Sequence, residues 1–163
     1  METSTTATPK RPADSSTEMV QLVLPNDANP LGFMLGGAVM HLIDIAGAIA
    51  AYRHTRQLLV TAFVDDLSFL HPIKVGDLII LQAHVTATFT TSLEVRVDVW
   101  SEETLTGIRR QTSCAYLTFV TLDRDGGKVV VPPLLLTSDA ERDEAAAAAV
   151  RRTARLEKRA AAR

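Results

Sequence analysis

An aspartate lies in the middle of the most apolar stretch of the chain. Asp44 is surrounded by residues 36–51, which otherwise consist almost only of glycine, alanine and large aliphatic side chains. Ionised carboxylates are almost never fully buried without a partner, because removing one from water costs several kcal/mol. Asp44 is therefore either satisfied by a structural partner, such as a nearby backbone N–H or His41, or exposed at a site that uses its charge.

The stretch from Gly36 to about residue 56 predicts one long helix that is apolar on every side, as is typical of a helix in the middle of a protein. Asp44 follows Gly37 by two helical turns, so both lie on roughly the same face. The first N–H groups of a helix are unpaired and carry partial positive charge. Glycines at this helix start let a ligand approach the backbone closely.

The second half of the chain changes to the period of β-strands. Residues 93–102 alternate cleanly, with apolar side chains at every odd position from Leu93 to Val99. Because the connections are short, neighbouring strands are expected to be antiparallel. The expected strands cover residues 19–24, 58–69, 78–89, 93–102 and 108–122. We therefore predict an α+β fold in which a long antiparallel sheet of about five strands wraps around one central apolar helix.

The two ends of the chain differ from this core. Residues 1–18 are rich in Thr, Ser, Pro and Ala, so we expect a disordered tail. Residues 19–136 form the expected domain. Residues 137–163 predict a charged helical extension that Ser138 caps and that projects or frays, because its apolar face is small.

Composition excludes several classes of function. The net charge of −2 gives no basic field for nucleic acid or an anionic membrane. The longest apolar run, residues 38–51, is shorter than the ~20 residues of a membrane-spanning helix. One cysteine, Cys114, excludes an intramolecular disulfide and suits a reducing compartment, so we expect a cytoplasmic protein. The histidines have no metal-ligand spacing, so no metal site is expected.

Several motifs together resemble one enzyme family. They are Pro25-Asn26-Asp27-Ala28-Asn29-Pro30-Leu31-Gly32, Gly36-Gly37, Leu42-Ile43-Asp44-Ile45-Ala46-Gly47-Ala48, residues 64–77, Thr91-Ser92-Leu93, Thr118-Phe119-Val120 and Pro132-Pro133-Leu134. The combination closely resembles hotdog-fold acyl-CoA thioesterases, in particular the bacterial single-domain acyl-CoA hydrolases related to the cytosolic long-chain acyl-CoA hydrolase. The resemblance covers residues 19–136.

The resemblance implies hydrolysis of acyl-CoA to a free acid and coenzyme A. It implies that Asp44 acts as general base on water or as nucleophile, two routes that the sequence does not separate. It also implies that Asn29 of the partner subunit assists Asp44, although Asn before Pro is also ordinary turn chemistry. A thioester carbonyl at the helix start would have its oxyanion stabilised by the backbone N–H of Gly37 or Ala38.

Coenzyme A carries phosphates, so basic residues are expected at the site entrance. The candidates for coenzyme A contacts are Gly36, Lys74, Thr91, Ser92, Arg96, Arg109 and Arg110. Coenzyme A is part of the substrate, and no cofactor is expected. The exposed edge of the sheet is expected to pair with a second copy, giving a homodimer, and the resemblance adds a possible trimer of dimers.

Two other functions fit the same fold. One is a non-catalytic module that binds acyl-CoA as a regulatory ligand, and the other is a hydratase. The acidic residue and the asparagine favour the hydrolase over the binding module. A hydratase usually needs a catalytic histidine at the loop and helix start, and residues 25–37 contain none. No Gly-x-Ser-x-Gly motif is present, which argues against an α/β-hydrolase esterase.

Overall fold

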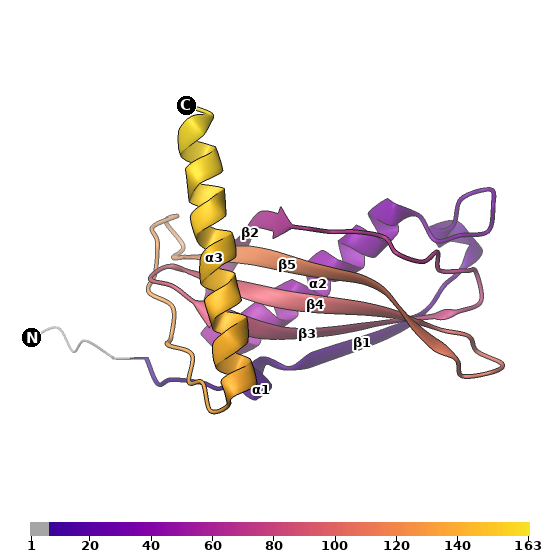
Figure 1. Cartoon of the computed structure of the whole chain (residues 1–163), viewed down its shortest axis with the longest axis horizontal. Coiled ribbons are helices and arrows are strands. Elements are labelled where there is room, and N and C mark those ends of the chain that lie inside the picture. The colour runs from indigo at the N-terminus through magenta and orange to yellow at the C-terminus, as the bar shows by residue number, and fades with distance from the viewer. Residues whose placement is uncertain (1–6) are drawn as a thin grey trace, which may run out of the picture.

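One long helix, α2 (Gly36–Thr55), lies across a five-stranded antiparallel sheet with the strand order β1-β3-β4-β5-β2 (Figure 1). The computed structural model describes residues 7–163. The strands are β1 (Thr17–Leu22), β2 (Leu58–Asp65), β3 (Leu78–Thr88), β4 (Ser92–Glu102) and β5 (Arg109–Leu122). Three further elements are α1 (Pro12–Ser15), the 3-10 helix η1 (Pro25–Asp27) and α3 (Asp139–Ala161). The predicted hotdog arrangement of five strands around one helix is confirmed.

The core lies between α2 and one face of the sheet. The alternating apolar side chains of β4, from Leu93 to Val99, are completely buried together with Ala46 and Phe119. Each large side chain buried in this way contributes roughly 1.5–3 kcal/mol relative to an exposed one. The alternation predicted from the sequence therefore selects the face that packs on α2.

The other side of α2 is not covered by its own chain. We expected the helix to be buried all round, but Met40 and Tyr52 keep 46% and 42% of their surface exposed. The physical reason is that five strands reach around only part of a helix. An uncovered apolar face of this kind is typical of a protein that associates with a second copy.

Strand β2 forms one edge of the sheet and pairs only with β5. Its pairing register shifts between Thr61 and Phe63, which leaves Ala62 as a bulge. A bulge changes the direction in which the following side chains point. Leu58, Val60 and Phe63 of this strand are each about half exposed, so an apolar strand edge is open to solvent in the single chain.

The predicted disordered tail of residues 1–18 is wrong for residues 7–18, which the structure describes as ordered. The Nζ of Lys10 donates to the backbone carbonyl of His54 over 2.8 Å, at the end of α2. The hydroxyl of Ser15 is buried and accepts from the N–H of Val85 over 3.0 Å. Polar side chains here pair with backbone groups of the folded domain, which composition alone does not reveal. Residues 1–6 lie outside the described part.

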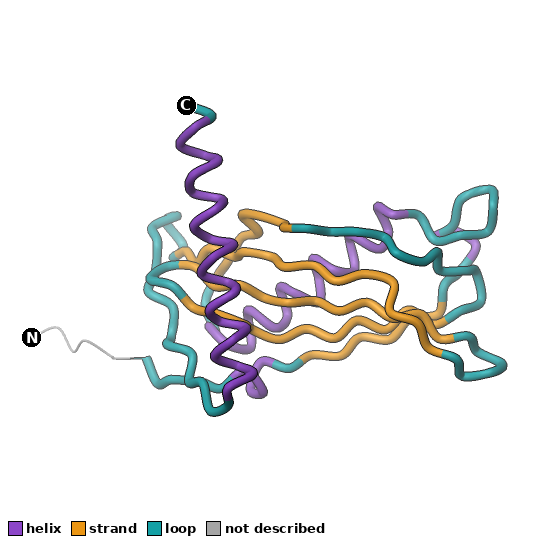
Figure 2. The backbone as a smooth tube through the Cα atoms, in the orientation of Figure 1, coloured by secondary structure: helices purple, strands orange, loops and turns teal. Residues whose placement is uncertain are grey.

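The prediction that the helix of residues 137–163 projects or frays is wrong for most of α3. The helix crosses the outer face of the sheet, opposite α2, and only its last turns extend past β2 (Figures 1 and 2). Ala148 is fully buried against the sheet. The ion pairs that hold the helix are Glu144 with Arg96, Arg151 with Glu94, and Arg155 with Asp65, and Glu144 also forms a hydrogen bond with His84. The charges of the helix thus complement a polar sheet face, and Ser138 caps the helix as predicted.

Within residues 7–163, no helix is both long enough and apolar enough to cross a membrane.

Candidate active site

Asp44 lies on α2 and is half-buried. Its Oδ1 accepts a hydrogen bond of 2.7 Å from the hydroxyl of Thr61. Both residues line one cavity of about 310 Å³. The other lining residues are Gly37, Met40, His41, Ile43, Val64, Leu67 and Leu117. Asp44 is therefore not sealed in the core; it presents a carboxylate to an otherwise largely apolar cavity.

Thr61 was not singled out by the sequence. It lies on the edge strand directly before the bulge at Ala62. Its cross-strand partner is Phe119, which belongs to the core, so Thr61 points toward α2. The only feature of the sequence that could have indicated a role for Thr61 is its hydroxyl group at an inward-facing position of an otherwise apolar strand. The bulge changes the register in which β2 pairs with β5 after Thr61, and the β-strand propensities of the residues do not predict it.

Asn29 lies in the loop between η1 and α2. Its side-chain Oδ1 accepts from the backbone N–H groups of Leu31, over 2.9 Å, and Phe33, over 3.2 Å. Gly32 in this turn has a φ of +80°, which favours glycine. Because the amide oxygen is occupied by the backbone, the Nδ2 group is the one left to act on a ligand. Asn29 thus makes the turn contacts expected of it and still keeps two donors.

Asn29 and Asp44 line different cavities. The Asn29 cavity, of about 370 Å³, also includes Gly36, Phe69 and Pro72. Gly36 lines this cavity, whereas the next residue, Gly37, lines the cavity of Asp44. The start of α2 therefore separates two half-sites in the single chain. The structure of one chain does not bring Asn29 and Asp44 together.

The helix start between these cavities keeps its donors available. The residue before α2 is Leu35, whose side chain cannot cap the helix. A methyl group added to Gly37 would meet nothing within 4 Å, so there is room beside the backbone. The N–H groups of Gly37 and Ala38 therefore have no side-chain cap and are accessible to a ligand, and their role as oxyanion donors stays a prediction.

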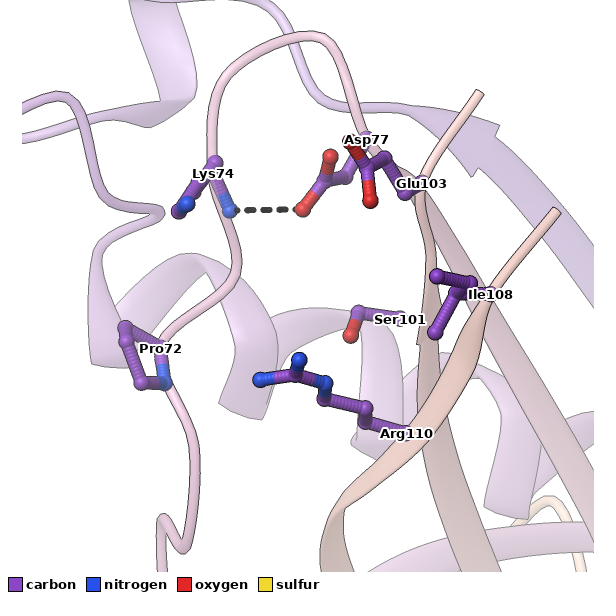
Figure 3. A pocket seen from close by; sticks show the side chains of 7 residues that line it. All are labelled: Pro72, Lys74, Asp77, Ser101, Glu103, Ile108 and Arg110. Atoms are coloured by element: carbon purple, nitrogen blue, oxygen red, sulfur yellow. Dashed lines mark hydrogen bonds between the residues drawn. The ribbon is translucent and has the colours of Figure 1, made fainter. Parts of the chain in front are cut away.

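Lys74 and Arg110 line a third cavity (Figure 3). This cavity shares Pro72 with the cavity of Asn29, so the two adjoin. A backbone bridge between Phe33 and Lys74 fixes the loop of Lys74 next to the loop of Asn29. Lys74 therefore lies next to the cavity of Asn29, and its contact with coenzyme A stays a prediction.

The other candidates for coenzyme A contacts are not brought to this region of the chain. Arg96 lies on the outer sheet face between Asp98, at 2.9 Å, and Glu144, at 3.1 Å. Arg109 pairs with Glu102. Thr91 and Ser92 lie at the β3–β4 turn, which contacts residues 121–131 near the far end of α2. The expected roles of Arg96, Thr91 and Ser92 thus find no support in the single chain.

Comparison with known proteins gives a consistent result. A family profile described as the thioesterase superfamily matches residues 31–108. An uncharacterised acyl-CoA thioester hydrolase of Bacillus subtilis is 40% identical over 119 residues, which are 73% of this chain and 69% of that protein. The human cytosolic acyl coenzyme A thioester hydrolase is 32% identical over 72% of this chain. The chain spans only about a third of the length of that human protein, since 32% of it is covered.

Solved structures agree with this result. An apo-hexameric acyl-CoA thioesterase superimposes with a TM-score of 0.89 at 37% identity, covering 96% of this chain and 99% of the other. A second similar structure is an acyl-CoA hydrolase of Staphylococcus aureus in complex with butyryl coenzyme A, coenzyme A and coenzyme A disulfide. It superimposes with a TM-score of 0.86 at 33% identity, covering 94% of this chain and 93% of the other. Three variants of the Staphylococcus aureus protein carry alanine in place of an aspartate, an asparagine and a threonine.

Proposed function

The chain belongs to the thioesterase superfamily, and on this premise we propose that it hydrolyses acyl-CoA thioesters to a free acid and coenzyme A at a site completed by two subunits. The observation that carries the proposal is the carboxylate of Asp44 beside an uncapped helix start, lining a cavity with Thr61. A carboxylate, an oxyanion site and an adjoining cavity are what thioester hydrolysis requires.

The residues replaced in the Staphylococcus aureus protein support the choice of residues. Its aspartate follows its asparagine by 15 positions, and its threonine follows the aspartate by 17. Asn29, Asp44 and Thr61 have the same two spacings in this chain. The threonine is the residue whose hydroxyl here bonds to the carboxylate. All three residues are therefore assigned to the site.

In the proposed reaction Asp44 acts on the thioester through its free Oδ2, because Oδ1 already accepts from Thr61. As general base it takes a proton from water, whose oxygen attacks the carbonyl carbon. As nucleophile it forms a mixed anhydride that water then hydrolyses. In both routes the C–S bond breaks, the thiolate of coenzyme A leaves, and the N–H of Gly37 or Ala38 stabilises the oxyanion.

Asn29 acts on the same reaction as a hydrogen-bond donor. Its Oδ1 is held by two backbone N–H groups, so only Nδ2 can contact the substrate or the water. A donor suits the carbonyl oxygen of the thioester or the oxygen of the attacking water. The partner subunit supplies this residue, because Asn29 and Asp44 of one chain line separate cavities.

The shared site requires an oligomer. Hexameric thioesterases are among the similar structures, which supports a homo-oligomer. We assign the dimer contact to the open edge of β2 and the uncovered face of α2, since both expose apolar side chains. The hexamers further support a trimer of dimers as the complete assembly.

The reaction consumes only acyl-CoA and water, so the proposal includes no cofactor. We place the enzyme in the cytoplasm, because a reducing compartment keeps a lone cysteine such as Cys114 as a free thiol.

The test is release of free thiol from acyl-CoA, followed with a chromogenic disulfide reagent over a panel from acetyl-CoA to palmitoyl-CoA. The wild type is expected to release coenzyme A, and Asp44→Asn to lose turnover by orders of magnitude. Tight binding of acyl-CoA without thiol release would instead indicate a regulatory module. Turnover of an enoyl-CoA by water addition would indicate a hydratase.

A further inference from the structure

The cavity of Lys74 and Arg110 is lined by these two cations and by two carboxylates. Among residues 7–163, neither Lys74 Nζ nor the Arg110 guanidinium forms an ion pair or a hydrogen bond. Figure 3 shows the guanidinium extending from β5 toward Pro72, with the hydroxyl of Ser101 next to it. The cavity measures about 120 Å³.

Arg110 differs in this respect from the neighbouring arginines of the sheet. Arg96 pairs with Asp98 and Glu144, and Arg109 pairs with Glu102. Since consecutive strand residues point to opposite faces, Arg109 and Arg110 face opposite sides of the sheet. Only the second of the two arginines is left for a ligand.

The sheet register places the cavity on the same side as α2. Arg110 pairs with Ser101, and Ser101 pairs with Ile79, which belongs to the core beneath α2. Directly paired residues share one face of a sheet. The cavity also shares Pro72 with the cavity of Asn29. A substrate whose carbonyl lies at the start of α2 can therefore extend into it.

Two carboxylates also line the cavity, and both already have partners. Asp77 accepts from the backbone N–H of Lys74 over 3.2 Å, and Glu103 accepts from the hydroxyl of Thr106 over 3.0 Å. Two carboxylates thus face two cations, but neither carboxylate forms an ion pair with Lys74 or Arg110 among residues 7–163. The cavity volume of about 120 Å³ leaves room for a phosphoryl group, since one water needs only roughly 10–15 Å³ of such space.

We propose that this cavity binds one phosphate group of the coenzyme A portion of the substrate, with Arg110 and Lys74 as the charged contacts and Ser101 as a hydroxyl donor. The inference rests on the proposed function, since it places the far end of the same substrate. A guanidinium binds phosphate through two parallel N–H···O bonds, which gives both affinity and orientation. The phosphate is either the 3′-phosphate or one group of the diphosphate.

The test compares KM for three thioesters of the same acid: acyl-CoA, acyl-3′-dephospho-CoA and S-acyl pantetheine, which has no phosphate. Arg110→Gln is expected to raise KM for acyl-CoA about tenfold with little change in kcat. The reason is that the loss of one hydrogen bond between charged groups lowers substrate affinity by about tenfold. Lys74→Gln is expected to act in the same direction. Neither variant is expected to change KM for S-acyl pantetheine. Arg109→Gln is the matched control and is expected to keep the wild-type KM.

The three substrates also identify the phosphate. If Arg110→Gln raises KM for acyl-CoA but not for acyl-3′-dephospho-CoA, the cavity binds the 3′-phosphate; if both rise, it binds the diphosphate. An unchanged KM for acyl-CoA in Arg110→Gln, an equal rise for S-acyl pantetheine, or an equal rise in Arg109→Gln would each overturn the inference. The proposed function fails separately, when the wild type hydrolyses none of the three thioesters.

Discussion

The hydroxyl of Thr61 donates to Oδ1 of Asp44 over 2.7 Å and joins the edge strand β2 to the central helix α2. The bond fixes one oxygen of the carboxylate and leaves the other for the reaction that we propose. It also links the site to the strand that we assign to the dimer contact. Asp44 is therefore oriented by the same element that is expected to bring in the second subunit.

Removal of this bond is expected to slow the reaction without unfolding the protein. A lost hydrogen bond to a charged group corresponds to roughly 1.5–3 kcal/mol, so Thr61→Val should lower kcat by about tenfold or more. Thr61→Ser keeps the hydroxyl and should retain most of the activity. Steady-state kinetics and thermal unfolding of both variants check this. Equal kcat values for the Val and Ser variants would exclude the hydroxyl from the mechanism.

Helix α2 packs tightly on the sheet at Gly47. A Cβ added there would lie 3.2 Å and 3.3 Å from two ring atoms of Phe119, which is fully buried and cannot move aside freely. We expect Gly47→Ala to lower the free energy of unfolding by about 1–3 kcal/mol, although alanine favours helix formation. Gly37→Ala, which meets nothing within 4 Å, is the control. Equal urea midpoints for the two variants would contradict the tight packing.

Helix α3 is held by a carboxylate that has no exposed surface. Glu94 is fully buried and accepts from Arg151 over 2.8 Å and from Thr86 over 2.7 Å. Arg151→Met leaves this charge buried without its cation, so we expect a loss of about 3 kcal/mol in urea unfolding. Arg142→Met breaks an exposed pair with Asp139 and should cost little. Equal losses of unfolding free energy in the two variants would contradict the role of the Arg151–Glu94 pair in holding α3.

His54 makes the stability depend on pH. It is fully buried at the end of α2, and its Nε2 bonds to the carbonyl of Pro132 over 2.8 Å. Burial lowers the pKa of His54 below its usual value of 6.5, because the charged ring loses its hydration. The folded state therefore prefers the neutral ring. Stability is complete above about pH 6.5 and decreases as the pH falls toward the lowered pKa.

The free energy of unfolding, measured in urea between pH 8 and pH 5, checks this dependence. We expect the wild type to lose stability below about pH 6.5. His54→Gln keeps an N–H donor without a titrating ring, and it should show a smaller loss over the same interval. The same slope in both proteins would assign the effect to other groups.

The sequence predicted the elements well because their signals are local. The alternation from Leu93 to Val99 and the apolar run around Asp44 each identify one element and the face it buries. The errors have non-local causes. Glu94 lies on the face opposite the apolar side chains of residues 93–99, and the alternation does not reveal that Arg151 of α3, 57 residues later in the chain, pairs with it there. Thr61 escaped notice because a bulge and a hydrogen bond 17 residues away define its role.

The assignment of Asn29 shows the limit of what one chain reveals. Its turn contacts follow from the residues Asn29-Pro30 and the positive φ of Gly32. Its proposed catalytic role depends on a second copy of the chain. No local pattern encodes that copy, and only the family resemblance indicated the role in advance.

The most direct test mixes two inactive chains. Asp44→Asn and Asn29→Ala, carrying different affinity tags, are refolded together and the heterodimer is purified through both tags. One of its two sites then combines an intact Asp44 with the intact Asn29 of the partner subunit, while the other site lacks both. A shared site predicts recovery of about half the wild-type kcat per dimer, from two parents that each have almost none. A confirmed heterodimer that stays as inactive as its parents would contradict a site built from two subunits.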